Sequence, residues 1–249
     1  MSALTDIPLR NTRVPNASVE RLHVIDLARG GALLCMIVFH VVRDLEVFAL
    51  VPAGTTLSGG WAIFARAIAG SFLFLSGVSL VLAHRHGFRA SAWLRRLTII
   101  TGAALLVTLA TYAVFPSRFV YFGILHAIAA CSIFGVPALF APAWATGLAA
   151  AAILSVSLTV GRSLFETPWL AWTGLSQAVP PALDYIPLFP WFAAFLAGIT
   201  IAKTARLPEL ALSTGLARSL VWSGQNSLVI YLTHQPVLIA IVWAIAQIG

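Results

Sequence analysis

An arginine and a histidine stand eleven residues apart in an apolar segment near the start of the chain. Within the stretch 21–46, Arg29 lies near the beginning, and His40 is followed closely by Arg43 and Asp44. On a helix this spacing separates Arg29 from His40 by about 16 Å along the axis. Charged and titratable side chains are costly inside a bilayer, so these residues are functional candidates.

His40 and Asp44 are four residues apart, so a continuing helix places them on one face. A carboxylate beside an imidazole raises its basicity and fixes its tautomer, which suits a general base. We therefore predict His40 and Asp44 as the catalytic pair. Arg29 and Arg43 have a simpler alternative, because their long side chains can reach the lipid headgroups.

The composition identifies the class of protein. The chain has 249 residues, of which 60% are hydrophobic and only 9% charged, and its mean hydropathy is +0.94. These values indicate an integral membrane protein. The net charge of +7 is then attributed to basic cytoplasmic loops rather than to nucleic-acid binding. Cys35 and Cys131 lie in apolar segments, and neither metal-ligand spacing nor a nucleotide-binding pattern is found.

Hydropathy and helix breakers predict an all-α, polytopic bundle of about seven transmembrane helices. Lysine and arginine concentrate before the first predicted span, between the second and third, and between the sixth and seventh. This pattern places the N-terminus in the cytoplasm and the C-terminus outside. Residues 1–20 are expected to form a cytoplasmic tail, and residues 21–249 the membrane domain. The predicted spans are Val24–Val42, Trp61–Ala83, Leu97–Phe115, Phe119–Phe140, Ala143–Gly161, Tyr185–Ala202 and Leu220–Ala246.

Arginines on the predicted cytoplasmic side form a candidate site for a phosphorylated ligand. Guanidinium groups bind phosphate oxygens well. The alternative is that these cations only set the topology and contact anionic lipid. The residues concerned are Arg29, Arg85, Arg89, Arg95 and Arg96.

Further polar residues are candidates for substrate or oxyanion contacts. Arg66 can reach the outer interface or pair with Asp44 or Glu46, and His126 has the simpler interpretation of a hydrogen-bonded core histidine. Pro236 frees a carbonyl one turn back, so a structural role for the residues just before it is equally open. The candidates are Arg66, Tyr121, His126, Asp184, His234 and Gln235.

Several segments resemble a known family in the same order along the chain. The stretch IDLARGGALLCMIVFH, with an arginine, ten residues and a histidine, resembles the first helix of membrane-embedded acyltransferases. The branch resembled contains heparan-alpha-glucosaminide N-acetyltransferase and its small bacterial relatives. The other matching segments are SFLFLSGVSLVLAHR, YFGILHAIAA, DYIPLFPWFAAFLAGI and GQNSLVIYLTHQPVL.

The resemblance implies an enzyme of a bacterial cytoplasmic membrane. It would take an acyl group, typically acetyl, from cytosolic acyl-CoA and deliver it to an amine or hydroxyl of a sugar or glycan outside. The histidine role falls on His40 and the inner arginine role on Arg29. The larger animal enzyme has asparagine at the position matching His40, and Thr55, Thr56 and Ser58 occupy the loop where that enzyme has a histidine.

Two other classes of protein remain open. In a transporter, His40, Asp44 and His126 would form a proton relay, but the paired inverted repeats common in transporters are not evident. In a non-catalytic membrane subunit, the acyltransferase scaffold would only pack against another complex. A homo-oligomer or a membrane-complex partner is compatible with each reading.

Overall fold

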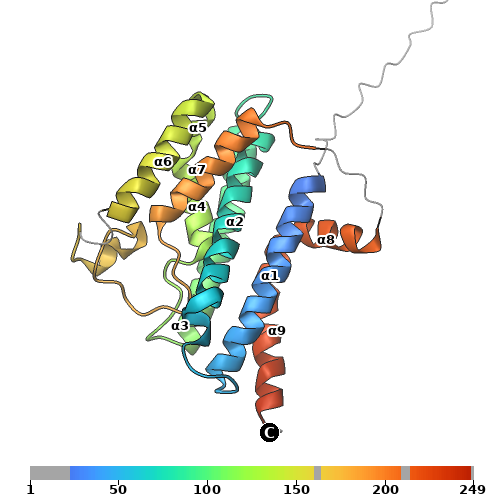
Figure 1. The fold of residues 1–249 in the computed structure, drawn as a ribbon, viewed down its shortest axis with the longest axis vertical. Helices are drawn as coiled ribbons and strands as arrows, with labels where there is room; N and C mark the ends of the chain where they lie inside the picture. Colours follow the sequence, from blue (N-terminus) through green and yellow to red (C-terminus); the bar gives the residue numbers. More distant parts are fainter. Residues whose placement is uncertain (1–22, 160–163, 209–213, 248–249) are drawn as a thin grey trace, which may run out of the picture.

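The computed structural model describes residues 23–159, 164–208 and 214–247, so the expected tail at 1–20 lies outside the described residues. Figure 1 shows a bundle of helices, and the described residues include no strand, which confirms the all-α prediction. Two short 3₁₀ helices, η1 (Thr55–Leu57) and η2 (Pro168–Thr173), lie in the connections. The α-helices are α1 (His23–Val47), α2 (Gly59–Ala83), α3 (Ala90–Val114), α4 (Ile124–Phe134), α5 (Val136–Phe140), α6 (Ala143–Thr159), α7 (Leu188–Thr204), α8 (Gly215–Gln225) and α9 (Ser227–Ala246).

Four of these helices, α1, α2, α3 and α9, are long and apolar enough to cross a membrane. Helices α4, α6 and α7 are apolar but shorter, with 10–17 residues each. A full crossing takes about 20 residues. The chain is therefore an integral membrane protein, while the prediction of about seven full spans is supported for four helices only.

Two segments predicted as single spans are each divided. The segment Phe119–Phe140 begins with a loop and is interrupted at Gly135, where Pro137 lies in the first turn of α5 and has no N–H to continue the helix of α4. The segment Leu220–Ala246 is divided at Asn226 into α8 and α9. Figure 1 shows α8 projecting sideways from α1 rather than running along the bundle.

Helices α2 and α7 pack with their backbones in contact. A Cβ atom added to Gly77 would lie 2.1 Å from the carbonyl oxygen of Phe195, and one added to Gly198 would lie 2.1 Å from that of Phe74. Small residues allow membrane helices to approach this closely. Helix α4 packs against both of them and α6 packs against α7, so α2 and α7 form the centre of the bundle.

Helix α1 is packed against α2, α8 and α9. Its contact with α8 also depends on glycines: a Cβ on Gly30 would lie 2.0 Å from the Leu220 carbonyl oxygen, and one on Gly224 would lie 1.9 Å from that of Asp26. In Figure 1, α8 crosses the N-terminal half of α1, and α9 runs beside its C-terminal half. Residues of α1 thus meet a different helix at each end.

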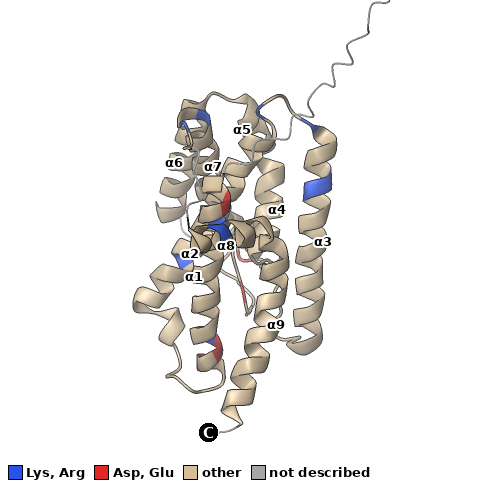
Figure 2. Cartoon of the chain, turned by 90° about the vertical axis from the view of Figure 1, so that its right-hand side faces the viewer, with Lys and Arg blue, Asp and Glu red and all other residues tan. Residues whose placement is uncertain are grey.

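Charged residues are unevenly distributed along the bundle. In Figure 2 most blue segments lie in the upper half, around α8 and the start of α3. Arg85 and Arg89 lie in the connection between α2 and α3, whereas Arg95 and Arg96 lie within α3 rather than in the loop expected from the sequence. One end of the bundle is therefore cationic.

The close packing of α2 on α7 makes a testable prediction about stability. Gly198→Ala should lower the free energy of unfolding by about 1–3 kcal/mol, because the methyl group forces two backbones apart. Gly102→Ala is the matched control, since a Cβ there meets nothing within 4 Å, and it should be neutral or slightly stabilising. Thermal unfolding in detergent compares the two variants. Equal stability would contradict the packing described.

Candidate active site: two polar clusters on one helix

The first cluster is built around Arg29, and we call it the inner cluster, and the one near His40 the outer cluster, after the orientation predicted from the sequence. Its guanidinium donates to the Asp26 carboxylate at 3.2 Å and to the Ser79 hydroxyl at 2.6 Å. The other oxygen of Asp26 accepts a hydrogen bond of 3.2 Å from the Gln225 amide. The cluster therefore joins α1 to α2 and α8.

Arg96 belongs to the same cluster. It donates to the Ser76 hydroxyl at 3.0 Å, and Ser76 lies one turn from Ser79 on α2. Arg96 is also close enough to Arg29 for the two charges to repel each other. These contacts bring two guanidinium groups together with one carboxylate, that of Asp26, so the cluster carries an excess positive charge that suits an anion.

The other three arginines predicted for this site lie outside the cluster. Arg85, Arg89 and Arg95 are exposed; Arg85 contacts His86, and Arg89 donates to the Ala83 carbonyl oxygen. Arg85 also lines a pocket of about 270 Å³ together with Lys203. These arginines are therefore available at the cationic surface rather than inside the bundle.

The outer cluster lies where α1 meets α9. The imidazole rings of His40 and His234 are 5.0 Å apart between centroids, at an interplanar angle of 61°. One carboxylate oxygen of Asp44 accepts a hydrogen bond of 2.7 Å from the Gln235 amide. Four residues singled out separately from the sequence thus meet as two adjacent pairs.

Several polar atoms in this outer cluster are buried without a hydrogen-bond partner. They are His40 Nδ1, Asp44 Oδ2, His234 Nε2 and Gln235 Oε1. The expected bond between Asp44 and His40 is not among the hydrogen bonds of the described residues; Asp44 accepts from Gln235 instead. A site rich in unused acceptor atoms suits a ligand that brings N–H or O–H donors.

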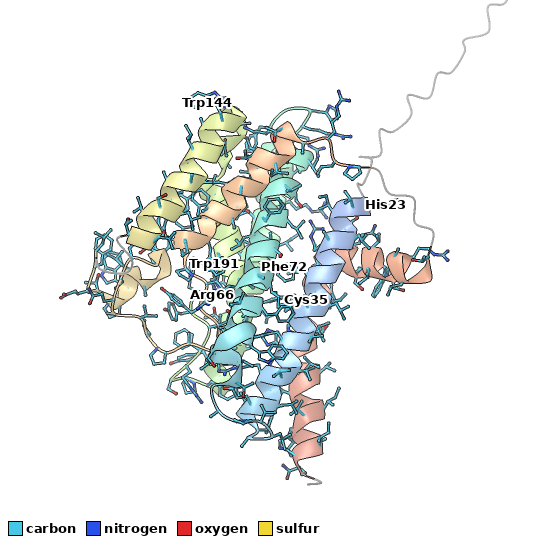
Figure 3. The ribbon with its side chains drawn as sticks, in the orientation of Figure 1. His23, Cys35, Arg66, Phe72, Trp144 and Trp191 are labelled. Carbon is cyan, nitrogen blue, oxygen red and sulfur yellow. The ribbon has the colours of Figure 1, made fainter. Side chains whose placement is uncertain are left out.

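The loop after α1 is tied back to the end of that helix. Glu46 accepts hydrogen bonds from the Thr56 N–H at 2.8 Å and from the Thr56 hydroxyl at 2.6 Å, and it pairs with Arg43 at 3.0 Å. Gly54 N–H also donates to Glu46 at 2.8 Å. A pair of Arg66 with Glu46 or Asp44, which the sequence allowed, is not among the ion pairs of the described residues. Figure 3 places Arg66 on the side of α2 that faces Trp191, and it is exposed.

His126 is fully hydrogen-bonded within the bundle. The Thr108 hydroxyl donates to the Val120 carbonyl oxygen at 2.7 Å, so it accepts from His126 Nε2, which is 3.2 Å away. His126 Nδ1 accepts from the Gly123 N–H at 3.3 Å, at the start of α4. The interpretation of His126 as a bonded core histidine fits this arrangement.

Asp184 and Tyr121 lie near the same helix start. Asp184 accepts a hydrogen bond of 3.1 Å from the Ile124 N–H, which is unpaired within α4, and negative charge is favourable at such a terminus. The Tyr121 ring packs against that of Tyr185, with 5.7 Å between centroids. These contacts fix the loop before α7 against the loop before α4.

An apolar groove of about 680 Å³ opens between α1, α2 and α7. On α1 it extends from Ala28 to Cys35, a rise of about 10 Å, and Figure 3 shows Cys35 between α1 and α2. The inward face of α1 between the two clusters is filled by Leu33 and Met36, which are 1% and 4% exposed. An extended ligand that reached from one cluster to the other would therefore lie in the groove beside them.

Sequence reasoning missed several partners in these clusters. Asp26, Ser76, Ser79 and Gln225 were not predicted, although the three-residue spacings of Asp26 to Arg29 and of Ser76 to Ser79 are readable signals of a shared helix face. Among the described residues, no group of three or more His, Cys, Asp and Glu side chains is arranged to hold a metal ion.

Asp184 makes the stability dependent on pH. Burial of this carboxyl raises its pKa from 3.8 to about 6, against the opposing hydrogen bonds from the Ile124 and Tyr185 N–H groups. The folded protein holds this proton more tightly than the unfolded chain, so stability should fall as the pH rises from about 4 to about 6 and stay lower above that range.

Asp184→Asn should remove this dependence, because the amide oxygen still accepts from the backbone and never ionises. The unfolding temperature of the variant should exceed that of the wild type at pH 7 and approach it at pH 4. Glu166→Gln, at an exposed carboxylate, is the control and should leave the wild-type profile unchanged. A profile for Asp184→Asn that parallels the wild type would refute the assignment.

Comparison with known families places these two clusters in context. Residues 21–236 match the family described as "Heparan-alpha-glucosaminide N-acetyltransferase, catalytic". No curated protein and no solved structure gave a significant match. The matched region contains both clusters and nearly all of the described bundle, and it indicates a membrane enzyme of the acetyltransferase type. The chain therefore belongs to the heparan-alpha-glucosaminide N-acetyltransferase catalytic-domain family.

Proposed function

We propose that this protein transfers an acyl group, most simply acetyl, from cytosolic acyl-CoA to an amine or hydroxyl of a sugar or glycan on the opposite side of a bacterial cytoplasmic membrane. The N-terminus and the cationic turn between α2 and α3 would face the cytoplasm, in accord with the positive-inside rule. The observation that carries the proposal is the placement of two different polar clusters along one helix, α1, about 16 Å apart.

The inner cluster is the proposed site for the phosphates of CoA. Arg29 and Arg96 together exceed the charge of Asp26, and planar guanidinium groups bind phosphate oxygens in pairs. The exposed Arg85, Arg89 and Arg95 would contact the remaining phosphate at the surface. The thin pantetheine arm would then extend along the groove between α1, α2 and α7.

The outer cluster is the proposed site of acyl transfer. His40 would accept the proton of the acceptor amine or hydroxyl as that group attacks the thioester carbonyl, and the proton would then pass to the departing CoA thiolate. Gln235 uses one N–H for Asp44, so its second N–H is available to the oxyanion of the tetrahedral intermediate. Asp44 would act as a positioning residue, because its bond to Gln235 holds α9 beside His40.

The donor site makes the first functional prediction. Arg29→Gln combined with Arg96→Gln should weaken acyl-CoA binding at least about tenfold, or about 1.4 kcal/mol, while glutamine keeps a hydrogen bond to the serines of α2. Binding of labelled, membrane-impermeant CoA is measured in inside-out and right-side-out vesicles, and only the former should bind it. Arg118→Gln, in an exposed loop at the other end of the bundle, is the control.

Undiminished binding by the double variant would refute the inner site. Binding by right-side-out vesicles alone would reverse the orientation and with it the assignment of donor and acceptor faces.

The base makes the second functional prediction. His40→Ala should reduce acetyl transfer by about 10²–10⁴-fold, because a positioned base contributes that much to the rate, while CoA binding at the other cluster persists. Asp44→Asn should be milder, since its amide oxygen still accepts from Gln235. Transfer is measured with labelled acetyl-CoA and a panel of amino sugars and glycans.

His126→Ala is the matched control. It removes hydrogen bonds at the start of α4, so it should lower stability while the folded fraction remains active. Full activity of His40→Ala would place the base elsewhere. A wild-type protein that binds CoA but transfers acetyl to no acceptor would instead favour the non-catalytic subunit.

A further inference from the structure

The tautomer of His234 is fixed by its own helix. Its Nδ1 lies 2.6 Å from the carbonyl oxygen of Tyr231, which can only accept a hydrogen bond. Nδ1 of the neutral ring must therefore carry the proton, and Nε2 must carry the lone pair. That Nε2 is buried and has no hydrogen-bond partner.

His40 is the polar ring beside this lone pair. The two ring centroids are 5.0 Å apart, and His40 Nδ1 is likewise buried without a partner. Asp44, the partner expected from the sequence, instead accepts a hydrogen bond from the Gln235 amide. His234 therefore supplies an unused acceptor atom next to an imidazole that lacks an orienting bond.

The position of His234 relative to His40 is itself constrained. The bond between Asp44 and Gln235 fastens α9 to α1 at the residue next to His234. The Tyr231 ring lies against the His234 ring, with 5.7 Å between centroids, and packs into the core near Met36. The imidazole of His234 is thus held by a backbone carbonyl, a neighbouring ring and an interhelical bond.

We propose that His234 is the positioning residue of a histidine pair, in which its Nε2 accepts the Nδ1–H of His40 and so directs the other nitrogen of His40, Nε2, toward the acceptor. This inference rests on the proposed function and adds a residue to it. A proton leaves the acceptor amine or hydroxyl for His40 Nε2 as the new bond to the acyl carbon forms. His40 Nδ1–H stays bonded to His234, and the proton on Nε2 passes to the CoA sulfur as the carbon–sulfur bond breaks.

The test compares His234→Phe, which keeps a ring but removes the acceptor atom, with His234→Gln, which restores an acceptor oxygen. The ¹⁵N chemical shifts of histidine-labelled protein report which nitrogen of His40 carries the proton. In the wild type we expect one tautomer, with the proton on Nδ1, and in His234→Phe a mixture of both. Thr233→Val, on the exposed neighbour in the same helix, is the matched control and should keep the wild-type spectrum.

Acetyl transfer supplies the second readout. His234→Phe should lose about tenfold to a hundredfold in kcat with unchanged CoA binding, which is the loss typical when the partner that orients a metal-bound histidine is removed. His234→Gln should recover part of this loss; if His234→Phe does not fold, His234→Leu removes the same acceptor atom and takes its place in the comparison with Thr233→Val. An unchanged tautomer in folded His234→Phe, or in the His234→Leu variant that replaces it, would overturn the proposal.

The two readouts separate this inference from the proposed function. If the wild type transfers no acyl group but shows one His40 tautomer that depends on His234, the pair exists and the proposed reaction fails. If transfer occurs and depends on His40 but not on His234, the reaction stands and the pair is refuted.

Discussion

Polar side chains on α1 can stay within an apolar bundle only if neighbouring helices give them hydrogen-bond partners. Asp26 is bonded by Gln225 of α8, Arg29 reaches Ser79 of α2, and Asp44 is bonded by Gln235 of α9. Each of these bonds joins α1 to a different helix. The positions of α8 and α9 therefore depend on the same residues that are candidates for chemistry.

The two ends of α1 differ in the charge and the hydrogen-bonding atoms that have no partner within the protein. At the inner end, Arg29 and Arg96 are accompanied by a single carboxylate, that of Asp26, so positive charge and N–H donors are in excess. At the outer end, Asp44 Oδ2 and Gln235 Oε1 are acceptors in excess. A CoA phosphate is complementary to the first set, and an amine or hydroxyl to the second. This polarity along one helix is the physical basis for assigning donor and acceptor substrates to opposite faces.

The sequence predicted the helical class and the existence of most helices, because hydropathy alone decides which segments can enter a membrane. It did not predict that α8 turns across α1. That crossing depends on the close approach of Gly30 and Gly224 to the opposing backbones, which is a long-range contact without periodicity. The interruption at Gly135 and Pro137 was readable in principle, but the long apolar run on either side of it favoured a single span.

Sequence reasoning selected the residues of the outer cluster, but it did not predict which of them contact each other. His40 and Asp44 were chosen because they share a helix face, and that spacing holds. The hydrogen-bond pairing in this cluster depends on how α9 is rotated against α1. No local sequence pattern encodes that rotation. Asp44 therefore meets Gln235 rather than His40, and His40 meets His234.

The histidines of this protein show how a structural role is distinguished from a chemical one. Both nitrogens of His126 are hydrogen-bonded, to Thr108 and to Gly123, so the ring has no atom left for a substrate. His40 and His234 each keep one buried nitrogen without a partner, and a buried polar atom left unpaired costs about 1–3 kcal/mol. Apolar side chains at these two neighbouring positions would pack α1 on α9 without the free-energy cost of two unpaired nitrogens. Their presence together is therefore better explained by the proposed histidine pair than by the packing of α1 on α9.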